Sequence, residues 1–142
     1  MGWVLKKKKG VGTPRKKLPI QLSASSRSNI LKPTFINIPI SNFDIINWVR
    51  YLRIKNFNGV LSLDKIDGQT KKGYYIMNLD DGKGPGTHWV GLKISPKIIE
   101  YFDSFGLNCP MEVISLSNKL KSNYIYNSTQ YQDLKSVLCG YY

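Results

Sequence analysis

The clearest pattern in the chain is a run of apolar residues at spacings of three and four that begins after Ile40. This spacing places the side chains along one face of a helix. Ser41 or Asn42 can cap its amino terminus, and Asp44 falls in the first turn, where a negative charge is favourable. We therefore predict a helix that ends near Lys55. Its apolar face comprises Phe43, Ile45, Ile46, Val49 and Leu52.

Shorter apolar segments after this helix predict strands, because they are rich in the aromatic and β-branched residues that favour extended backbone. The predicted strands cover residues 60–63, 74–79, 88–94, 98–103 and 124–126, and residues 111–120 are predicted to be helical. Only Ser95-Pro96-Lys97 separates the strands at 88–94 and 98–103, so we expect these two to be antiparallel neighbours. The whole pattern predicts an α+β fold and contains no internal repeat.

The first 28 residues carry much positive charge and little apolar material. The chain has a net charge of +12 from 21 Lys and Arg residues, and seven of these lie before Ile20 with no acidic residue among them. Such a segment cannot offset its ordering entropy by burial, so we predict a disordered basic tail at 1–28 and one folded domain at 29–142. The basic residues are Lys6, Lys7, Lys8, Lys9, Arg15, Lys16 and Lys17. They suit a nuclear-import signal or nonspecific binding to nucleic-acid phosphates, and a tail that only keeps the protein soluble is the alternative.

Membrane and secretory signals are missing from the sequence. No stretch approaches the roughly 20 apolar residues of a membrane span, and the start lacks the apolar region of a secretory signal. Lys6 stands where an N-myristoylation motif requires Ser or Thr. We therefore expect no membrane partner and an intracellular protein in which Cys109 and Cys139 are reduced thiols. No Cys/His cluster suggests a metal site, and no cofactor is expected.

One histidine and one acid flank the predicted hairpin. His88 is the only histidine in the chain and begins one strand, and Asp103 ends the next. The acid could orient the imidazole across the hairpin. Both residues also have ordinary uses, since a lone histidine is usually structural or at the surface and an Asp ahead of Gly106 can simply form a turn.

Cys139, near the end of the chain, has neighbours in the sequence that suit a reactive thiol. Gln132 precedes Cys139 by seven positions, and Gly140 would let a substrate approach the backbone closely. A cysteine and a histidine in one domain can form a nucleophile and its base. Cys109 fits an inert core thiol or a loop thiol instead.

These residues, taken together and in order, resemble the signature of a family of cysteine peptidases. His88-Trp89, then Tyr101-Phe102-Asp103-Ser104-Phe105-Gly106, then Gln132 and Cys139-Gly140 are similar in order and spacing to adenain, the adenovirus maturation protease, and to the SUMO-processing Ulp/SENP enzymes. The likeness is strongest to the adenain-like proteases of large DNA viruses and of Maverick elements in animal genomes. It extends from about Ile38 to the end of the chain.

The resemblance implies a role for each matching residue. His88 would be the general base, Asp103 would orient its ring, Cys139 would be the nucleophile, and Gln132 would donate to the oxyanion. Gln130 lies nine residues before Cys139 and misses the family's spacing. The implied fold is papain-like with permuted residue order, namely His, Asp, Gln, Cys, and with an antiparallel central sheet flanked by helices.

The resemblance also implies an activity and a setting. We expect an endopeptidase that cleaves viral or element-encoded precursor proteins in the nucleus or virion, or otherwise in the cytoplasm. A SUMO- or ubiquitin-type isopeptidase would use the same four residues. Because family members continue into a long helix after the cysteine, we expect this domain to be incomplete at its carboxyl end and residues 1–142 alone to have little or no peptidase activity. An inactive remnant that binds nucleic acid through the basic tail is the remaining alternative, and whether nucleic acid activates the enzyme is left open.

Overall fold

A six-stranded mixed sheet with strand order β1-β6-β5-β4-β3-β2 organises the described part of the chain, which comprises residues 3–6, 39–67, 70–84 and 86–142 of a computed structural model. The strands are β1 Trp3–Lys6, β2 Phe57–Ser62, β3 Gly73–Asn78, β4 Trp89–Ile94, β5 Ile98–Phe102 and β6 Asn123–Asn127. The central pairs β3–β4 and β4–β5 are antiparallel, β2–β3 and β5–β6 are parallel, and β1 is antiparallel to β6. The predicted α+β class and the β4–β5 hairpin are confirmed.

The first helix, α1, spans Asn42–Tyr51 and begins with a capping box. Ser41 Oγ accepts the Asp44 amide at 3.3 Å, and the Asp44 carboxylate accepts the Ser41 amide at 2.8 Å, so two helix-end donors are satisfied. The helix ends earlier than the predicted Lys55, because Arg53 turns to a φ of +51° that a helix cannot contain.

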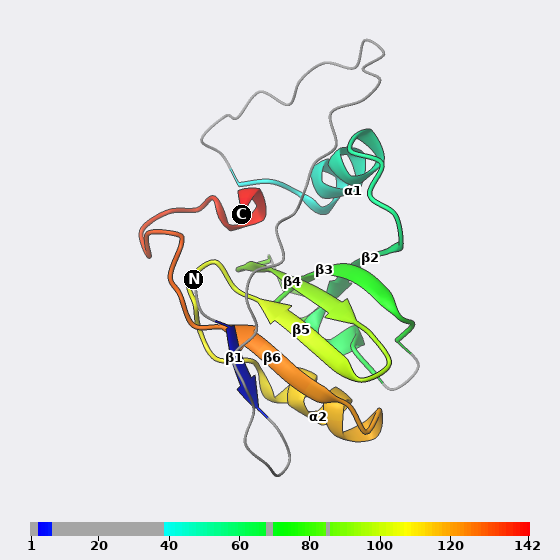
Figure 1. Cartoon of the computed structure of the whole chain (residues 1–142). Helices are drawn as coiled ribbons and strands as arrows, with labels where there is room; N and C mark the ends of the chain where they lie inside the picture. Colours follow the sequence, from blue (N-terminus) through cyan, green and yellow to red (C-terminus); the bar gives the residue numbers. More distant parts are fainter. Residues whose placement is uncertain (1–2, 7–38, 68–69, 85) are drawn as a thin grey trace.

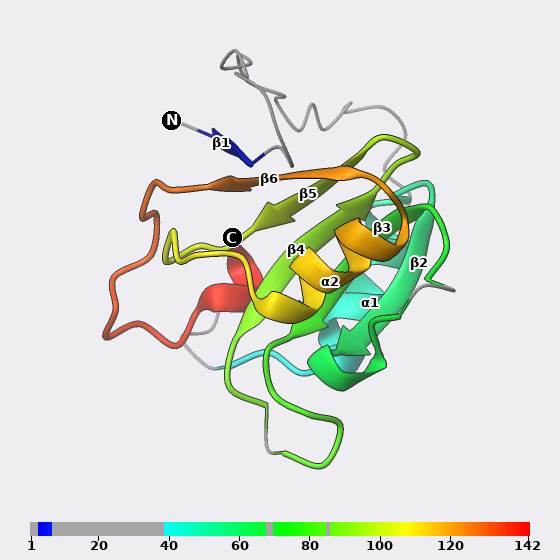
Figure 2. The same ribbon diagram turned by 90° about the horizontal axis from the view of Figure 1, so that it is seen from below.

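The main core lies on one face of the sheet, under the second helix α2, which spans Met111–Lys119. Residues alternate between buried and partly exposed along β4 and β5, as expected for strands with one face turned to a core. The core comprises Tyr75, Met77, Val90, Leu92, Ile94, Ile99, Tyr101, Cys109, Val113, Leu116 and Tyr126. Figures 1 and 2 show α2 covering this face, whereas α1 and the short 3-10 turn η2, Cys139–Tyr141, lie on the other side.

Some predicted boundaries differ from the observed elements. β2 begins at Phe57 instead of residue 60, with a bulge between Phe57 and Gly59, and Leu63 belongs to the 3-10 turn η1, Leu63–Lys65. The segment Trp3–Lys6 was predicted to be part of a disordered tail, but its backbone pairs with β6, Trp3 opposite Asn127. The other predicted nucleic-acid-binding residues, Lys7, Lys8, Lys9, Arg15, Lys16 and Lys17, lie outside the described residues.

Candidate active site

The β4–β5 hairpin brings His88 and Asp103 together. His88 directly precedes β4 and Asp103 directly follows β5, and the antiparallel register pairs Gly91 with Phe102 near that end of the hairpin. His88 Nε2 lies 2.8 Å from Asp103 Oδ1. His88 is only 8% exposed and Asp103 is fully buried. A hydrogen bond between a buried imidazole and a buried carboxylate fixes the ring and favours its protonated form.

The loop that follows β5 surrounds this pair. The Phe105 amide donates to Asp103 Oδ1 at 2.8 Å, and the Phe105 ring stacks on the His88 ring with centroids 4.5 Å apart. Gly106 has a φ of +71°, and a Cβ there would lie 2.8 Å from the backbone of Thr129. Glycine is required at this turn for both reasons. The imidazole is thus held by a carboxylate at one edge and a ring against its face.

Gln132 is attached to the same loop by its side chain and its backbone. Ser104 Oγ donates to Gln132 Oε1 at 2.6 Å, and the amides of Tyr131 and Gln132 donate to the Ser104 carbonyl at 2.8 and 3.0 Å. Gln132 Nε2 donates to the Ser136 carbonyl at 2.9 Å, which assigns the amide orientation, because a carbonyl can only accept. Gln132 is 1% exposed, and its NH₂ group keeps a second hydrogen for another acceptor.

Cys139 is placed beside this hairpin by contacts with β4 and with the start of α1. Its Sγ accepts the Trp89 amide at 3.4 Å, one residue after His88. The Trp89 indole donates to the Ile40 carbonyl at 3.0 Å. Gly140 packs so closely on Ile40 that a Cβ would overlap its side chain, and the Tyr141 ring contacts the Trp48 ring edge-on with centroids 5.1 Å apart. These contacts hold the η2 turn against the sheet.

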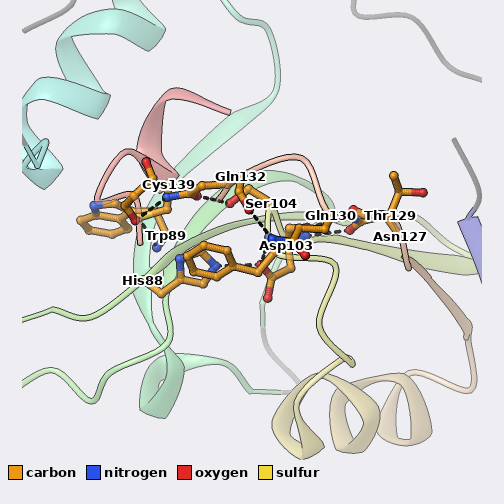
Figure 3. A network of polar contacts seen from close by, with 11 residues as sticks. His88, Trp89, Asp103, Ser104, Asn127, Thr129, Gln130, Gln132 and Cys139 are labelled. Atoms are coloured by element: carbon orange, nitrogen blue, oxygen red, sulfur yellow. Dashed lines mark hydrogen bonds and ion pairs between the residues drawn. The ribbon is translucent and has the colours of Figure 1, made fainter. Parts of the chain in front are cut away.

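Figure 3 shows the resulting network as one line of side chains, with Cys139 and Trp89 at one end, Gln132 and Ser104 in the middle, and Asp103 and Asn127 towards the other. The His88 ring lies next to this line and points to Asp103. His88, Asp103, Gln132 and Cys139, which the sequence analysis singled out, therefore meet in one place.

The electrostatics favour a charged pair. Burial alone lowers the pKa of His88, but the hydrogen bond to Asp103 and the nearby Cys139 sulfur outweigh burial and raise that pKa to about 9. Burial likewise opposes ionisation of the Cys139 thiol, but His88 and the Trp89 amide lower its pKa below the ordinary value. His88 Nδ1 is buried and has no hydrogen-bond partner among the described residues. With Nε2 occupied by Asp103, Nδ1 is the ring nitrogen available to exchange a proton.

The second cysteine has the opposite environment. Cys109 is 7% exposed and packs in the core beneath α2. Burial raises the pKa of its thiol to about 12. A thiol of this kind is almost entirely protonated at neutral pH and is unreactive. The two cysteines thus give one protein a reactive candidate and an internal reference.

Two further residues of the site were assigned no role from the sequence. Ser104 belongs to the motif that carries the family resemblance, whereas Asn127 gave no signal, because asparagine is common at strand ends. Both are buried and hydrogen-bonded to the predicted residues. Gln130, the rival of Gln132, donates to the Gln132 carbonyl at 2.8 Å and so supports that residue's backbone.

The described residues do not form a metal site or a membrane-spanning helix. Within the described ranges, no group of three or more His, Cys, Asp or Glu side chains gathers as a metal site would require, and neither helix is long and apolar enough to cross a membrane. A surface hollow of about 220 Å³ lies against α2, lined by Ile66, Met111 and Lys119 among others, and the four residues of the network do not line it.

The chain matches no known family model, and no curated protein is significantly similar to it.

Proposed function

We propose that this chain carries the catalytic residues of a cysteine peptidase, with Cys139 as nucleophile and His88 as base. The observation that carries the proposal is the buried His88 to Asp103 contact of 2.8 Å, with the Cys139 sulfur held one residue away by the Trp89 amide. A thiol beside a buried histidine and acid suits nucleophilic attack by a thiolate.

The first step is acylation of the sulfur. Proton transfer from Cys139 to His88 Nδ1 gives a thiolate and an imidazolium, and Asp103 stabilises the imidazolium through Nε2. The thiolate attacks the carbonyl carbon of a peptide bond, and a tetrahedral oxyanion forms. When the C–N bond breaks, His88 gives its proton to the leaving amine and a thioester remains. Water then attacks the thioester with His88 as base, which releases the acid and restores the thiol.

Two donors are suited to the oxyanion. The Gln132 amide keeps one hydrogen beyond its bond to Ser136, and the Cys139 backbone amide donates no hydrogen bond among the described residues. Each donor in comparable sites contributes roughly 3 kcal/mol to the transition state. Gln132 thus combines two roles in this proposal, since it also ties the loop that carries Cys139 to Ser104.

The proposed substrate is a protein precursor. The resemblance of the residue set to adenain-like proteases supports this choice of substrate. The test uses purified protein and three substrates: an unstructured protein such as casein, a fluorogenic peptide library, and a ubiquitin-like protein joined to a reporter through its carboxyl terminus. Cleavage of the first two that disappears in Cys139→Ser and His88→Ala supports the endopeptidase. Cleavage of the third alone indicates an isopeptidase.

The controls separate chemistry from folding. Cys109→Ser should retain whatever activity the unmodified chain has, because the Cys109 thiol lies in the core beneath α2. Circular dichroism should show the fold in every variant. Turnover that persists in Cys139→Ser would overturn the proposal, as would an unmodified chain that neither cleaves a substrate nor reacts at Cys139 with a peptide aldehyde.

A further inference from the structure

Asn127 ends β6 and directs all of its side-chain polar atoms to the neighbouring loop. The residue is 1% exposed. Its Oδ1 accepts the Asp103 amide at 2.8 Å, and its Nδ2 donates to the Asp103 carbonyl at 2.7 Å and to the Thr129 carbonyl at 3.0 Å. The side-chain oxygen and both side-chain amide hydrogens therefore each have a backbone partner.

The two bonds to Asp103 hold its backbone from both sides. The parallel ladder of β5 and β6 pairs Tyr101 with Tyr126, and the strand β5 ends at Phe102. Beyond that point the Asn127 side-chain amide bonds both the N–H and the C=O of Asp103, as a neighbouring strand would. Fixing both peptide planes fixes the direction of the Cα–Cβ bond between them.

This direction matters because the Asp103 carboxylate has few other anchors. Its Oδ1 holds His88 and the Phe105 amide, whereas its Oδ2 is buried and has no partner among the described residues. The Asp103 backbone therefore contributes to the orientation of the carboxylate, and the Asn127 side chain holds that backbone together with the Gly106 amide, which donates to the Asp103 carbonyl at 2.9 Å.

The third bond links the acid to the glutamine. Asn127 donates to the Thr129 carbonyl, and three residues further along the chain the Gln132 side chain accepts from Ser104. Asn127 thus sets the start of the turn that leads to Gln132, while Ser104 sets its end. The Asn127 side chain is thus connected both to Asp103 and to the segment that carries Gln132.

We propose that Asn127 is a positioning residue of this site, which aligns the Asp103 carboxylate with His88 and fixes the start of the segment that carries Gln132. The inference rests on the proposed function for its catalytic meaning. It concerns a geometry, however, that can be measured whether or not a substrate is cleaved.

The test follows the titration of His88 by NMR of the imidazole. Because His88 is the only histidine in the chain, its signals need no assignment. In the unmodified protein we expect a pKa of about 9. In Asn127→Ala the carboxylate is released from its alignment, and the His88 pKa should fall by about 1 or more, as expected when a close opposite charge is weakened. Alkylation of Cys139 should then require higher pH.

Two control variants distinguish positioning from general loss of stability. Asn58 donates an exposed amide hydrogen to the Lys72 carbonyl at 2.8 Å, so Asn58→Ala removes a bond of the same type away from the site. Val113→Ala opens the core beneath α2 and should lower Tm without touching the network. Both should leave the His88 pKa unchanged. Asn127→Ser retains an oxygen near the Asp103 amide and replaces Asn127→Ala if that variant does not fold.

Several outcomes would overturn the assignment. These are an unchanged His88 pKa in a folded Asn127 variant, an equal fall in Val113→Ala, and failure of both Asn127 variants to fold while Val113→Ala folds, which would leave only a structural role. Failure of the proposed function looks different, because absence of Cys139-dependent cleavage leaves the comparison of His88 pKa values intact.

Discussion

Alkylation of the two cysteines provides a direct comparison of their environments. The perturbation is treatment with iodoacetamide at pH 7 of two single-thiol variants, Cys109→Ala and Cys139→Ala. A thiol with a pKa of about 12 is ionised to only about one part in 10⁵ at this pH, whereas an ordinary thiol with a pKa near 8.5 is ionised to about 3%. The ratio of thiolate fractions is thus about 3,000 even if Cys139 were not activated.

Intrinsic nucleophilicity reduces this ratio. A thiolate of higher pKa attacks faster, with a Brønsted coefficient of roughly 0.45, so a difference of about 3.5 in pKa returns a factor of about 40 to Cys109. The expected ratio of rates is then about 80 in favour of Cys139 before access is considered. Because Cys109 is also 7% exposed, we expect at least about 100-fold.

The contribution of His88 is read from the pH profile. In the variant that retains Cys139, lowering of the thiol pKa should extend the alkylation plateau below the range of an ordinary thiol. Adding His88→Ala removes the first stabiliser of the thiolate, so the profile should move to higher pH. The assay is mass spectrometry of the labelled protein over time at pH 5 to 10. Comparable rates for the two cysteines, or a profile that His88→Ala does not move, would refute the reasoning.

Three further predictions concern stability, packing and charge. Between about pH 6.5 and 9 the contributions of His88 and Cys139 to the unfolding free energy should oppose each other. The raised pKa of His88 stabilises the fold below about 6.5 and this contribution is lost as pH rises through about 9, whereas the lowered pKa of Cys139 gives the opposite slope. Urea titrations of Cys139→Ala should therefore show stability that falls with rising pH, and an unchanged slope would contradict the coupling. Gly140→Ala should reduce turnover on the order of 100-fold, because a Cβ there overlaps Ile40 and displaces the neighbouring sulfur. Gly91→Ala is the control, since a Cβ there makes only ordinary contacts, and equal losses in the two variants would count against placement of the sulfur by Gly140. Deleting residues 1–19 should abolish most salt-sensitive binding to duplex DNA, measured by fluorescence anisotropy at several salt concentrations, and an unchanged salt slope would exclude the tail as the binding element.

The hairpin that joins His88 to Asp103 could be predicted from the sequence because its information is local. Two strands of strong propensity are separated by three residues, and this fixes both partners and direction. The helix α1 was predicted for the same reason, since its capping residues Ser41 and Asp44 are only three positions apart. Its end was missed, because the backbone at Arg53 takes a positive φ that residue type alone did not indicate.

The segment between β6 and Cys139 has no periodic pattern, so its course could not be derived from local rules. Its shape depends on a hydrogen bond from Ser104, which lies 28 residues before Gln132, and on Asn127, whose side chain bonds both Thr129 and the distant Asp103 backbone. The family resemblance selected Gln132 and Cys139 without indicating how they are held. The strand Trp3–Lys6 was missed because four residues next to a lysine block carry too little signal, and its pairing with β6 is a tertiary effect.

The way Cys139 is held has a consequence for the order of folding. The bond between His88 and Asp103 spans 15 residues, whereas the contact of the sulfur with Trp89 spans 50 and the contact of Trp89 with Ile40 spans 49. Short loops close at lower entropic cost, so the His88–Asp103 pair can form while the chain is still largely open. The sulfur gains its environment only after both long loops close. Until then Cys139 is an ordinary thiol, so under the proposed function a partly folded chain would not cleave its own exposed peptide bonds.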